Sequence, residues 1–229
     1  MENIGLVIFD VAGTTAKDEG LVVKAFISAA QSQGVEEGSL AMAKMVEYVK
    51  ETMGQRKIDV FTQLFENDTK LAAAAHDVFV ETYLRLVADG ELEEFEGVSE
   101  LFTKLRERHI GIALTTGFPR EILDLIIESL GWTEHIDFSV AASEVSFGRP
   151  YPDMIFRAIE SFNIQFGMDF HPDDIAVVGD TISDMQSGVS AGARFVVGIN
   201  SGTHSSDQLR TTGATHVLDS VTDLLTQVN

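Results

Sequence analysis

The chain has 229 residues, 45% of them hydrophobic, and it carries a formal net charge of −20 at pH 7. That charge argues against nucleic-acid and acidic-membrane partners because no basic block gathers anywhere, and the lack of cysteine excludes a disulfide framework, a thiolate metal site and a cysteine nucleophile. Because the apolar runs are too short to cross a bilayer and the N-terminus lacks the basic start of a signal peptide, we expect a cytoplasmic protein.

The first predicted element is a short strand at residues 4–9, which is apolar on both faces and is followed directly by Asp10. Between about residues 18 and 90 the pattern indicates helix after helix. One of these helices ends at Gly34, and another begins at the N-cap Thr69. We predict no strand in this block.

After residue 95, helices and strands alternate. The predicted helices are VSELFTKLRERH, PREILDLIIESLG, PDMIFRAIESF and ISDMQSGVSAG, and the predicted strands are GIALTT, DFSVAA, DIAVVGD and RFVVGI, followed by a loop, a short strand THVLD and a terminal helix. Such alternation favours an α/β fold with a doubly wound parallel sheet. We therefore predict an α/β core at residues 1–16 and 95–229 and an inserted α-helical cap at residues 17–94.

Polar side chains mark four places in this core, at FDVAGTT, LTTG, GRPYPDM and VVGDTISDM. Taken singly, each has an ordinary structural interpretation, since an Asp after a strand is often a turn residue or a helix cap. An Arg before a Pro is usually a surface charge. Parallel strands, however, gather their carboxyl ends at one edge of a sheet, so these segments are expected to meet there.

The chemistry of the four segments is complementary. Three carboxylates offer the hard oxygens that Mg²⁺ prefers: Asp10, Asp180 and Asp184. The other candidates suit a phosphoryl group, because the hydroxyl of Thr116 and the amide of Gly117 can donate hydrogen bonds and Arg149 can neutralise negative charge. Together they predict a magnesium-dependent phosphoryl site.

In this order the motifs resemble those of the haloacid dehalogenase superfamily of aspartyl phosphotransferases. The resemblance implies that Asp10 attacks phosphorus and forms an aspartyl-phosphate. It also implies that Asp10, the backbone carbonyl of Ala12 and Asp180 hold Mg²⁺, with Asp184 in support. Two positions depart from the family pattern: the usual acid two residues after the nucleophile is Ala12, and the usual Lys of the third motif is Arg149.

The residue at position 12 limits which leaving groups the site can protonate. A phosphate ester leaves as an alkoxide and benefits from a proton donor, which alanine cannot provide. In the predicted cap, ETMGQRKIDVF resembles the cap motif of the phosphonoacetaldehyde hydrolase family, which carries a Schiff-base lysine. The matching residues are Met53, Gly54, Lys57, Ile58 and Asp59.

The resemblance implies one coherent chemistry. Breaking a carbon–phosphorus bond expels a carbanion, and an iminium formed on Lys57 can accept its electrons. Lys57 must be a free amine to react, so a cationic or desolvated setting should lower its pKa. The candidate catalytic residues are therefore Asp10, Lys57, Thr116 and Arg149, with Met53 and Gly54 setting substrate specificity from the cap.

Some positions differ from phosphonoacetaldehyde hydrolases. Val60 stands where that family has a His, Phe118 where it has a Tyr, and a Cys of the early cap is replaced near Leu21. We interpret all six histidines as structural or surface residues, because none pairs with another at metal-ligand spacing, and we expect no zinc site.

The sequence predicts a Mg²⁺-dependent hydrolase that cleaves the carbon–phosphorus bond of phosphonoacetaldehyde or a closely related 2-oxoalkylphosphonate. One alternative is a phosphatase of the same superfamily acting on a small phosphate ester. Another is a non-catalytic protein that binds phosphorylated ligands. The resemblance also implies a homodimer formed through the caps, with no nucleic-acid or membrane partner.

Overall fold

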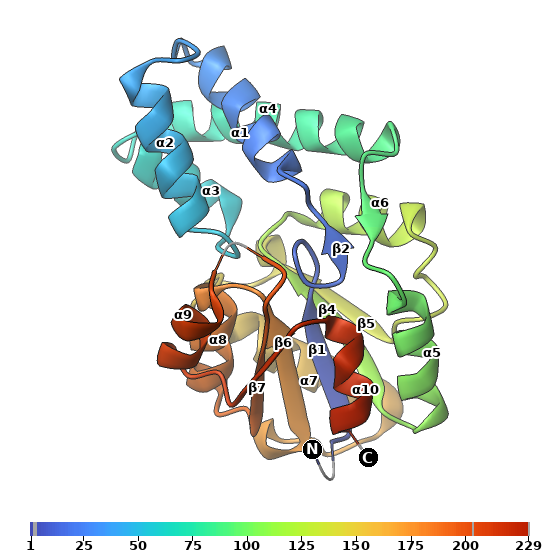
Figure 1. The fold of residues 1–229 in the computed structure, drawn as a ribbon. Helices are drawn as coiled ribbons and strands as arrows, with labels where there is room; N and C mark the ends of the chain where they lie inside the picture. The colour runs from blue at the N-terminus through green and yellow to red at the C-terminus, as the bar shows by residue number, and fades with distance from the viewer. Residues whose placement is uncertain (2–3, 203, 229) are drawn as a thin grey trace.

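The computed structural model describes residues 1, 4–202 and 204–228. Its centre is a parallel sheet with the strand order β5-β4-β1-β6-β7-β8 (Figure 1). The strands are β1 (Leu6–Asp10), β4 (Gly111–Thr116), β5 (Phe138–Ala141), β6 (Ile175–Gly179), β7 (Phe195–Ile199) and β8 (His216–Leu218). Every pair of neighbours is parallel, so all the carboxyl ends lie at one edge. The predicted doubly wound α/β fold is confirmed.

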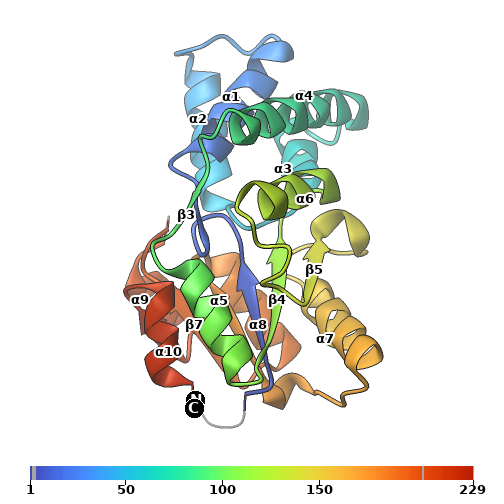
Figure 2. The same ribbon diagram turned by 90° about the vertical axis from the view of Figure 1, so that its right-hand side faces the viewer.

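Helices cover both faces of the sheet (Figure 2). They are α5 (Val98–Glu107), α6 (Arg120–Ser129), α7 (Asp153–Phe166), α8 (Ile182–Ala191), α9 (Ser206–Thr211) and α10 (Leu224–Gln227). Because successive side chains of a strand point to opposite faces, β1 contributes side chains to two apolar cores. Val7 and Phe9 pack into the core that includes α5 and α10, whereas Leu6 and Ile8 pack into the one that includes α7.

A block of helices lies beyond the carboxyl edge of the sheet (Figure 1). It consists of α1 (Leu21–Ser32), α2 (Leu40–Glu51), α3 (Lys57–Leu64) and α4 (Thr69–Ala88), which we call the cap. Its core is aromatic: the ring centroids of Phe26 and Phe61 lie 4.3 Å apart, and Phe79 lies 5.0 Å from Phe26. The division of the chain at residues 16/17 and 94/95 into core and cap stays a prediction. Among the described residues, no helix is long and apolar enough to span a membrane.

Three local predictions need correction. Asp68, not Thr69, is the N-cap of α4, because its carboxylate accepts hydrogen bonds from the first amides of the helix. The segment after β7 is not only a loop, since it contains the short helix α9. The two linkers between core and cap form a small antiparallel sheet that the sequence did not indicate, with β2 (Ala16–Lys17) paired to β3 (Glu93–Glu94).

Candidate active site

The site is built at the carboxyl edge of the sheet, where β1, β4 and β6 end side by side. Asp10 is the last residue of β1 and lies in register with Thr115 of β4. Asp180 directly follows β6, the other neighbour of β1. An apolar strand that stops on a carboxylate thus delivers that carboxylate to the shared edge, as the sequence predicted.

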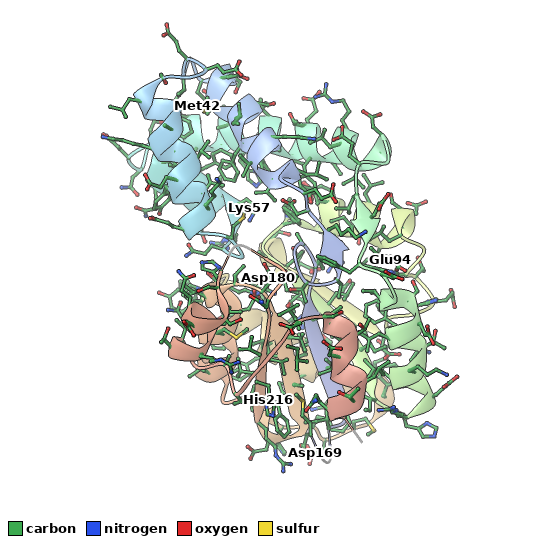
Figure 3. The ribbon with its side chains drawn as sticks, viewed as in Figure 1. Met42, Lys57, Glu94, Asp169, Asp180 and His216 are labelled. Atoms are coloured by element: carbon green, nitrogen blue, oxygen red, sulfur yellow. The ribbon has the colours of Figure 1, made fainter. Side chains whose placement is uncertain are left out.

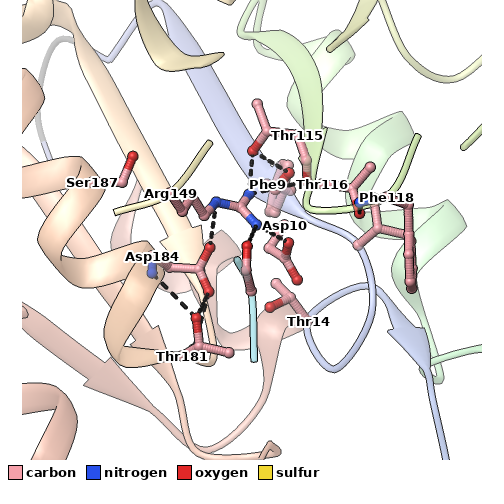
Figure 4. A network of polar contacts seen from close by, with 12 residues as sticks. Phe9, Asp10, Thr14, Thr115, Thr116, Phe118, Arg149, Thr181, Asp184 and Ser187 are labelled. Atoms are coloured by element: carbon pink, nitrogen blue, oxygen red, sulfur yellow. Dashed lines mark hydrogen bonds and ion pairs between the residues drawn. The ribbon is translucent and has the colours of Figure 1, made fainter. Parts of the chain in front are cut away.

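Arg149 is the centre of the polar network (Figure 4). Its Nη1 donates to Asp10 Oδ1 at 2.5 Å, and its Nε pairs with Asp184 Oδ1 at 2.9 Å. Its Nη2 donates to the hydroxyl and the carbonyl oxygen of Thr115. The side chain is only 4% exposed. These donors are directed at protein groups, so Arg149 positions Asp10 and Asp184, and its expected role in neutralising phosphate stays a prediction.

Asp184 is fixed at the start of α8 by a reciprocal cap. Its Oδ2 accepts hydrogen bonds from the amide and the hydroxyl of Thr181 at 3.0 and 2.6 Å, while its own amide donates to Thr181 Oγ1. With Oδ1 held by Arg149, both carboxylate oxygens are engaged. The predicted metal role of Asp184 is therefore best understood as support of the other ligands.

Asp10, Asp180 and Asp184 form a buried cluster whose carboxylate oxygens lie within 4.8 Å of one another. Burial raises the pKa of Asp10 to about 7 against the opposing effect of Arg149. Burial and the neighbouring carboxylates raise the pKa of Asp180 well above its usual range. Hard oxygens and excess negative charge together fit Mg²⁺, because a divalent cation would relieve the repulsion that Arg149 alone does not offset.

The turn after β1 shapes the space beside Asp180. The carbonyl of Val11 accepts hydrogen bonds from the amides of residues 14–16, which folds the chain back tightly. Gly13 has φ +93°, and a Cβ there would lie 2.6 Å from Asp180 Oδ2. Thr14 donates from its hydroxyl to Asp180 Oδ1 at 2.9 Å. Glycine is thus required next to the carboxylate, while Thr14 orients it.

The loop at residues 52–56, between α2 and α3, brings the cap onto the core. Gly54 has φ +82°, and a Cβ there would lie 2.5 Å from Thr181 Oγ1. A Cβ on Gly117 would in turn overlap the backbone oxygens of Gln55 and Gly54. The amide of Lys57 donates to the carbonyl of Gly117 at 3.2 Å. These contacts describe a cap closed over the end of β4.

Closure buries the predicted Schiff-base lysine. Lys57 is 4% exposed, and its Nζ donates to the carbonyl of Gln55 at 3.3 Å. Burial lowers the pKa of Lys57 to about 8, opposed mainly by the charges of Asp10 and Asp18. Figure 3 shows Lys57 on the cap and Asp180 on the core, on opposite sides of the region where the two meet.

One cavity of about 360 Å³ connects the cap and core residues. The predicted residues that line it are Asp10, Ala12, Met53, Gly54, Lys57, Thr116, Gly117 and Asp180. Arg149 and Asp184 lie behind this wall rather than in it. The structure therefore brings both predicted reaction centres to one space, the carboxylate on β1 and the amine on α3.

Several contributing residues were missed by sequence reasoning. Thr115, Thr14 and Thr181 orient the carboxylates and Arg149, and all three lie inside motifs that were noticed although no role was assigned to them. Asp18 lines the cavity, and its Oδ1 accepts a hydrogen bond from the hydroxyl of Tyr83 in α4. No local pattern marks that pair, because the two residues are 65 positions apart.

Comparison with known proteins gives concordant findings. Residues 7–198 match the family described as haloacid dehalogenase-like hydrolase. The chain is 33% identical to a phosphonoacetaldehyde hydrolase of Bacillus cereus (strain G9842), in a match that covers 86% of this chain and 75% of that protein.

Solved structures share the fold. A phosphonoacetaldehyde hydrolase-like protein from Oleispira antarctica superposes with a TM-score of 0.80 at 21% identity, covering 98% of this chain and 92% of that one. A predicted phosphatase from Clostridium acetobutylicum gives a TM-score of 0.81 at 19% identity, covering 98% and 97%. At these identities the likeness concerns the fold alone.

Proposed function

The chain belongs to the haloacid dehalogenase-like hydrolases, and on that premise we propose that it cleaves the carbon–phosphorus bond of phosphonoacetaldehyde or a closely related 2-oxoalkylphosphonate. The observation that carries this proposal is a single cavity lined by Asp10, Ala12 and the buried Lys57. A nucleophilic carboxylate, a missing general acid and a readily deprotonated amine are what this cleavage needs. The named relative from Bacillus cereus supports the same substrate class.

Lys57 prepares the carbon side of the bond. As a free amine it attacks the aldehyde carbon, and loss of water leaves an iminium two bonds from phosphorus. When the carbon–phosphorus bond breaks, its electron pair moves into the new carbon–carbon double bond and neutralises the iminium as an enamine. A pKa of about 8 leaves roughly a tenth of Lys57 unprotonated at pH 7, against about three in ten thousand at the ordinary value of 10.5.

Asp10 receives the phosphoryl group. Arg149 holds Oδ1 of Asp10, which leaves Oδ2 to attack phosphorus and form the aspartyl-phosphate that water then hydrolyses. Mg²⁺, held by Asp10, Asp180 and the carbonyl of Ala12, would supply the positive charge that screens the phosphoryl oxygens from the attacking carboxylate. The hydroxyl of Thr116 and the amide of Gly117, both on the cavity wall, donate to the remaining oxygens.

Because residue 12 is alanine, the site has no general acid at this position. An acid at this position would protonate an alkoxide oxygen, but the leaving group of a phosphonate is carbon, whose electrons go to the iminium. A methyl side chain at position 12 also leaves room in the cavity for the Lys57 adduct. The alternative, hydrolysis of a small phosphate ester, has no donor at this position.

Borohydride trapping tests the proposal. The protein is incubated with phosphonoacetaldehyde and Mg²⁺, and free phosphate is assayed while a parallel sample is reduced, digested and weighed by mass spectrometry. We expect phosphate release and a reduced adduct on Lys57, with both lost in Lys57→Arg. Lys104→Arg is the matched control, because Lys104 is exposed on α5, where it pairs with Glu107, and does not line the cavity.

Three other results would contradict it in distinct ways. Phosphate release by Lys57→Arg at the wild-type rate would remove the Schiff base from the mechanism. Hydrolysis of phosphate esters without action on the phosphonate would favour the phosphatase alternative. Turnover of neither, with phosphorylated ligands bound but unchanged, would favour a binding protein, whereas any turnover abolished by Asp10→Asn excludes that last reading.

A further inference from the structure

Asp18 is a titratable group on the cavity wall that the proposed chemistry leaves without a role. It lies between β2 and α1, so it belongs to the linker that enters the cap. It lines the same cavity as Lys57 and Asp10. Its carboxylate is separate from those of Asp10 and Asp184, which pair with Arg149.

Tyr83 orients the Asp18 carboxylate through a hydrogen bond. The Tyr83 side chain is fully buried in α4, 4.6 Å from the ring of Phe118 between centroids. Its hydroxyl donates to Asp18 Oδ1 at 3.3 Å. A buried phenol needs a hydrogen-bond partner, and the one that the structure provides is a carboxylate on the cavity wall.

Asp18 also has an ordinary structural role. Its carboxylate accepts a hydrogen bond from the amide of Val22 in the first turn of α1, at 3.2 Å to Oδ1. Such a cap needs only an oxygen acceptor, which an Asn side chain also offers. It does not require a group that exchanges protons, so the cap does not account for a carboxyl group on the wall of the cavity that Lys57 also lines.

The electrostatics link Asp18 to Lys57. Burial raises the pKa of Asp18, while the hydrogen bond from Val22 and the charge of Lys57 act in the opposite direction. The charge of Asp18 in turn raises the otherwise lowered pKa of Lys57. The titratable groups that act on Asp18 are thus Lys57 from α3 and Tyr83 from α4, and Asp10 acts on both of these.

We propose that Asp18, oriented by Tyr83, is the acid–base group for imine formation at Lys57. This role rests on the proposed function, because it requires an aldehyde substrate and an imine on Lys57. A proton passed through a water molecule in the shared cavity, from the Lys57 ammonium to the Asp18 carboxylate, produces the free amine and the carboxylic acid together. The cavity supplies both reactive forms in one transfer, with no outside base.

Imine formation at Lys57 passes through a carbinolamine. The Lys57 amine adds to the aldehyde carbon, and the nitrogen proton moves to the former carbonyl oxygen, giving a carbinolamine. The Asp18 acid then gives its proton to that hydroxyl group, the carbon–oxygen bond breaks and water leaves. The iminium and the Asp18 carboxylate remain. At the end of the cycle, the enamine takes a proton from solvent on its terminal carbon and becomes the product iminium. Water then adds to the iminium carbon, its released proton returns to Asp18, and the resulting carbinolamine collapses to the product aldehyde and the free Lys57 amine.

Asp18→Asn tests this role directly. The Asn side chain keeps an acceptor for Val22 but cannot give a proton. The rate of the adduct on Lys57 is followed by quenching phosphonoacetaldehyde reactions with borohydride at increasing times. We expect this rate to fall about 100-fold. Asp68→Asn is the matched control, since the Asp68 carboxylate also accepts hydrogen bonds from amides in the first turn of a cap helix and does not line the cavity; its rate should equal that of the wild type.

The pH profile separates proton transfer from helix capping. Wild-type adduct formation should be bell-shaped, because it needs a free Lys57 amine and a protonated Asp18 at once. In Asp18→Asn the alkaline decline should disappear, since no second group must hold a proton. The proposed role of Asp18 is overturned if folded Asp18→Asn forms the adduct at the wild-type rate. It is also overturned if the pH profile of the variant stays bell-shaped.

Tyr83→Phe provides a second test if Asp18→Asn does not fold. The hydroxyl of Tyr83 favours the ionised form of Asp18, so its removal should move the break of the profile that reports Asp18 to higher pH. An unmoved break overturns the role of the pair. Failure of the proposed function gives a different pattern, because the wild type itself would then form no adduct on Lys57, and the role of Asp18 would fall with it.

Discussion

The Nζ atom of Lys57 lies 5.2 Å from the centroid of the Phe118 ring. Phe118 follows Gly117 at the end of β4 and is itself buried, so the amine is held between the cap and an aromatic surface of the core. An aromatic face attracts a cation, but it replaces little of the hydration that burial removes. The balance explains why an amine in a chain of net charge −20 still has a lowered pKa.

Lys57→Met should stabilise the fold at neutral pH. Below pH 8 both folded and unfolded chains carry the Lys57 proton, so the burial cost of the ammonium is fully present. Between about 8 and 10.5 the unfolded chain binds more protons, and wild-type stability rises with pH relative to the variant. A shift of this size corresponds to about 3 kcal/mol in the free energy of unfolding.

Urea unfolding in a metal-free buffer at pH 7 and pH 10 measures this difference. The advantage of Lys57→Met should shrink at the higher pH, because the folded wild type has then lost the Lys57 proton while most unfolded chains still carry it. Lys104→Met, at an exposed position, should change stability by no more than about 0.5 kcal/mol. An advantage of Lys57→Met that does not depend on pH would refute the burial argument.

Arg149→Met should be strongly destabilising. The change leaves Asp10 and Asp184 buried without the guanidinium that contacts both. Removing one partner of a buried ion pair costs about 3–5 kcal/mol. Arg149→Lys should lose less, because an ammonium keeps the charge, although its three donors lie on one nitrogen and cannot span Asp10, Asp184 and Thr115 as the planar guanidinium does.

Thermal and urea unfolding at pH 7 and pH 4 check the Arg149 prediction. The loss should be smaller in acid, where Asp10 is protonated because its pKa is raised to about 7. Arg157→Met is a suitable control, since Arg157 is an exposed arginine of α7 that pairs with Glu160. Equal stability of Arg149→Met and Arg157→Met would mean that the buried network contributes nothing.

The sheet and the carboxylate edge could be predicted because their signals are local. An apolar run that stops on Asp10, and another that stops before Asp180, are visible in the sequence, and parallel pairing brings such ends together. The alternation of helices and strands likewise fixes the fold class. Helix starts were less certain, since Asp68 and Thr69 are both good caps and only the structure separates them.

The parts that could not be predicted depend on the direction of side chains across long separations. Arg149 and Asp10 are 139 positions apart, and the charge of Arg149 gave no sign that its donors would contact Asp10 and Thr115. Asp18 and Tyr83 meet only because α4 packs against the start of α1. A residue type can indicate what chemistry is available, but three-dimensional packing decides which group uses it.

Gly117→Ala should prevent full closure of the cap. The added Cβ would overlap the backbone of residues 54 and 55, which cannot move aside as a flexible side chain could. Phosphate release should fall by about 100-fold, because Lys57 would no longer be held near the phosphoryl site. Small-angle X-ray scattering should show a larger radius of gyration, with little change in melting temperature.

Gly34→Ala is the control for the glycine substitution itself. Gly34 has φ +84° and no atom near its Cβ position, so its variant introduces backbone strain without a collision. It should lower stability slightly and leave phosphate release unchanged. If Gly117→Ala retains wild-type activity and dimensions, the contact between the loop at 52–56 and β4 does not govern closure.

Asp180→Asn should separate metal binding from folding. The variant removes one charge from a cluster of three carboxylates, and a unit charge 4 Å from a cation contributes about 4 kcal/mol near a protein surface. Mg²⁺ affinity measured by calorimetry should therefore fall at least about 100-fold. The metal-free protein should melt at the same temperature or higher, because the neighbouring charges of Asp10 and Asp184 already disfavour an ionised Asp180.

Thermal melts with and without MgCl₂ complete this test. Wild type should gain stability from the ion, since a ligand that binds only the folded state stabilises it by mass action. Asp180→Asn should lose that gain, whereas the exposed Asp173→Asn should keep it. An equal magnesium-induced shift in all three proteins would place the ion elsewhere and remove Asp180 from the metal site.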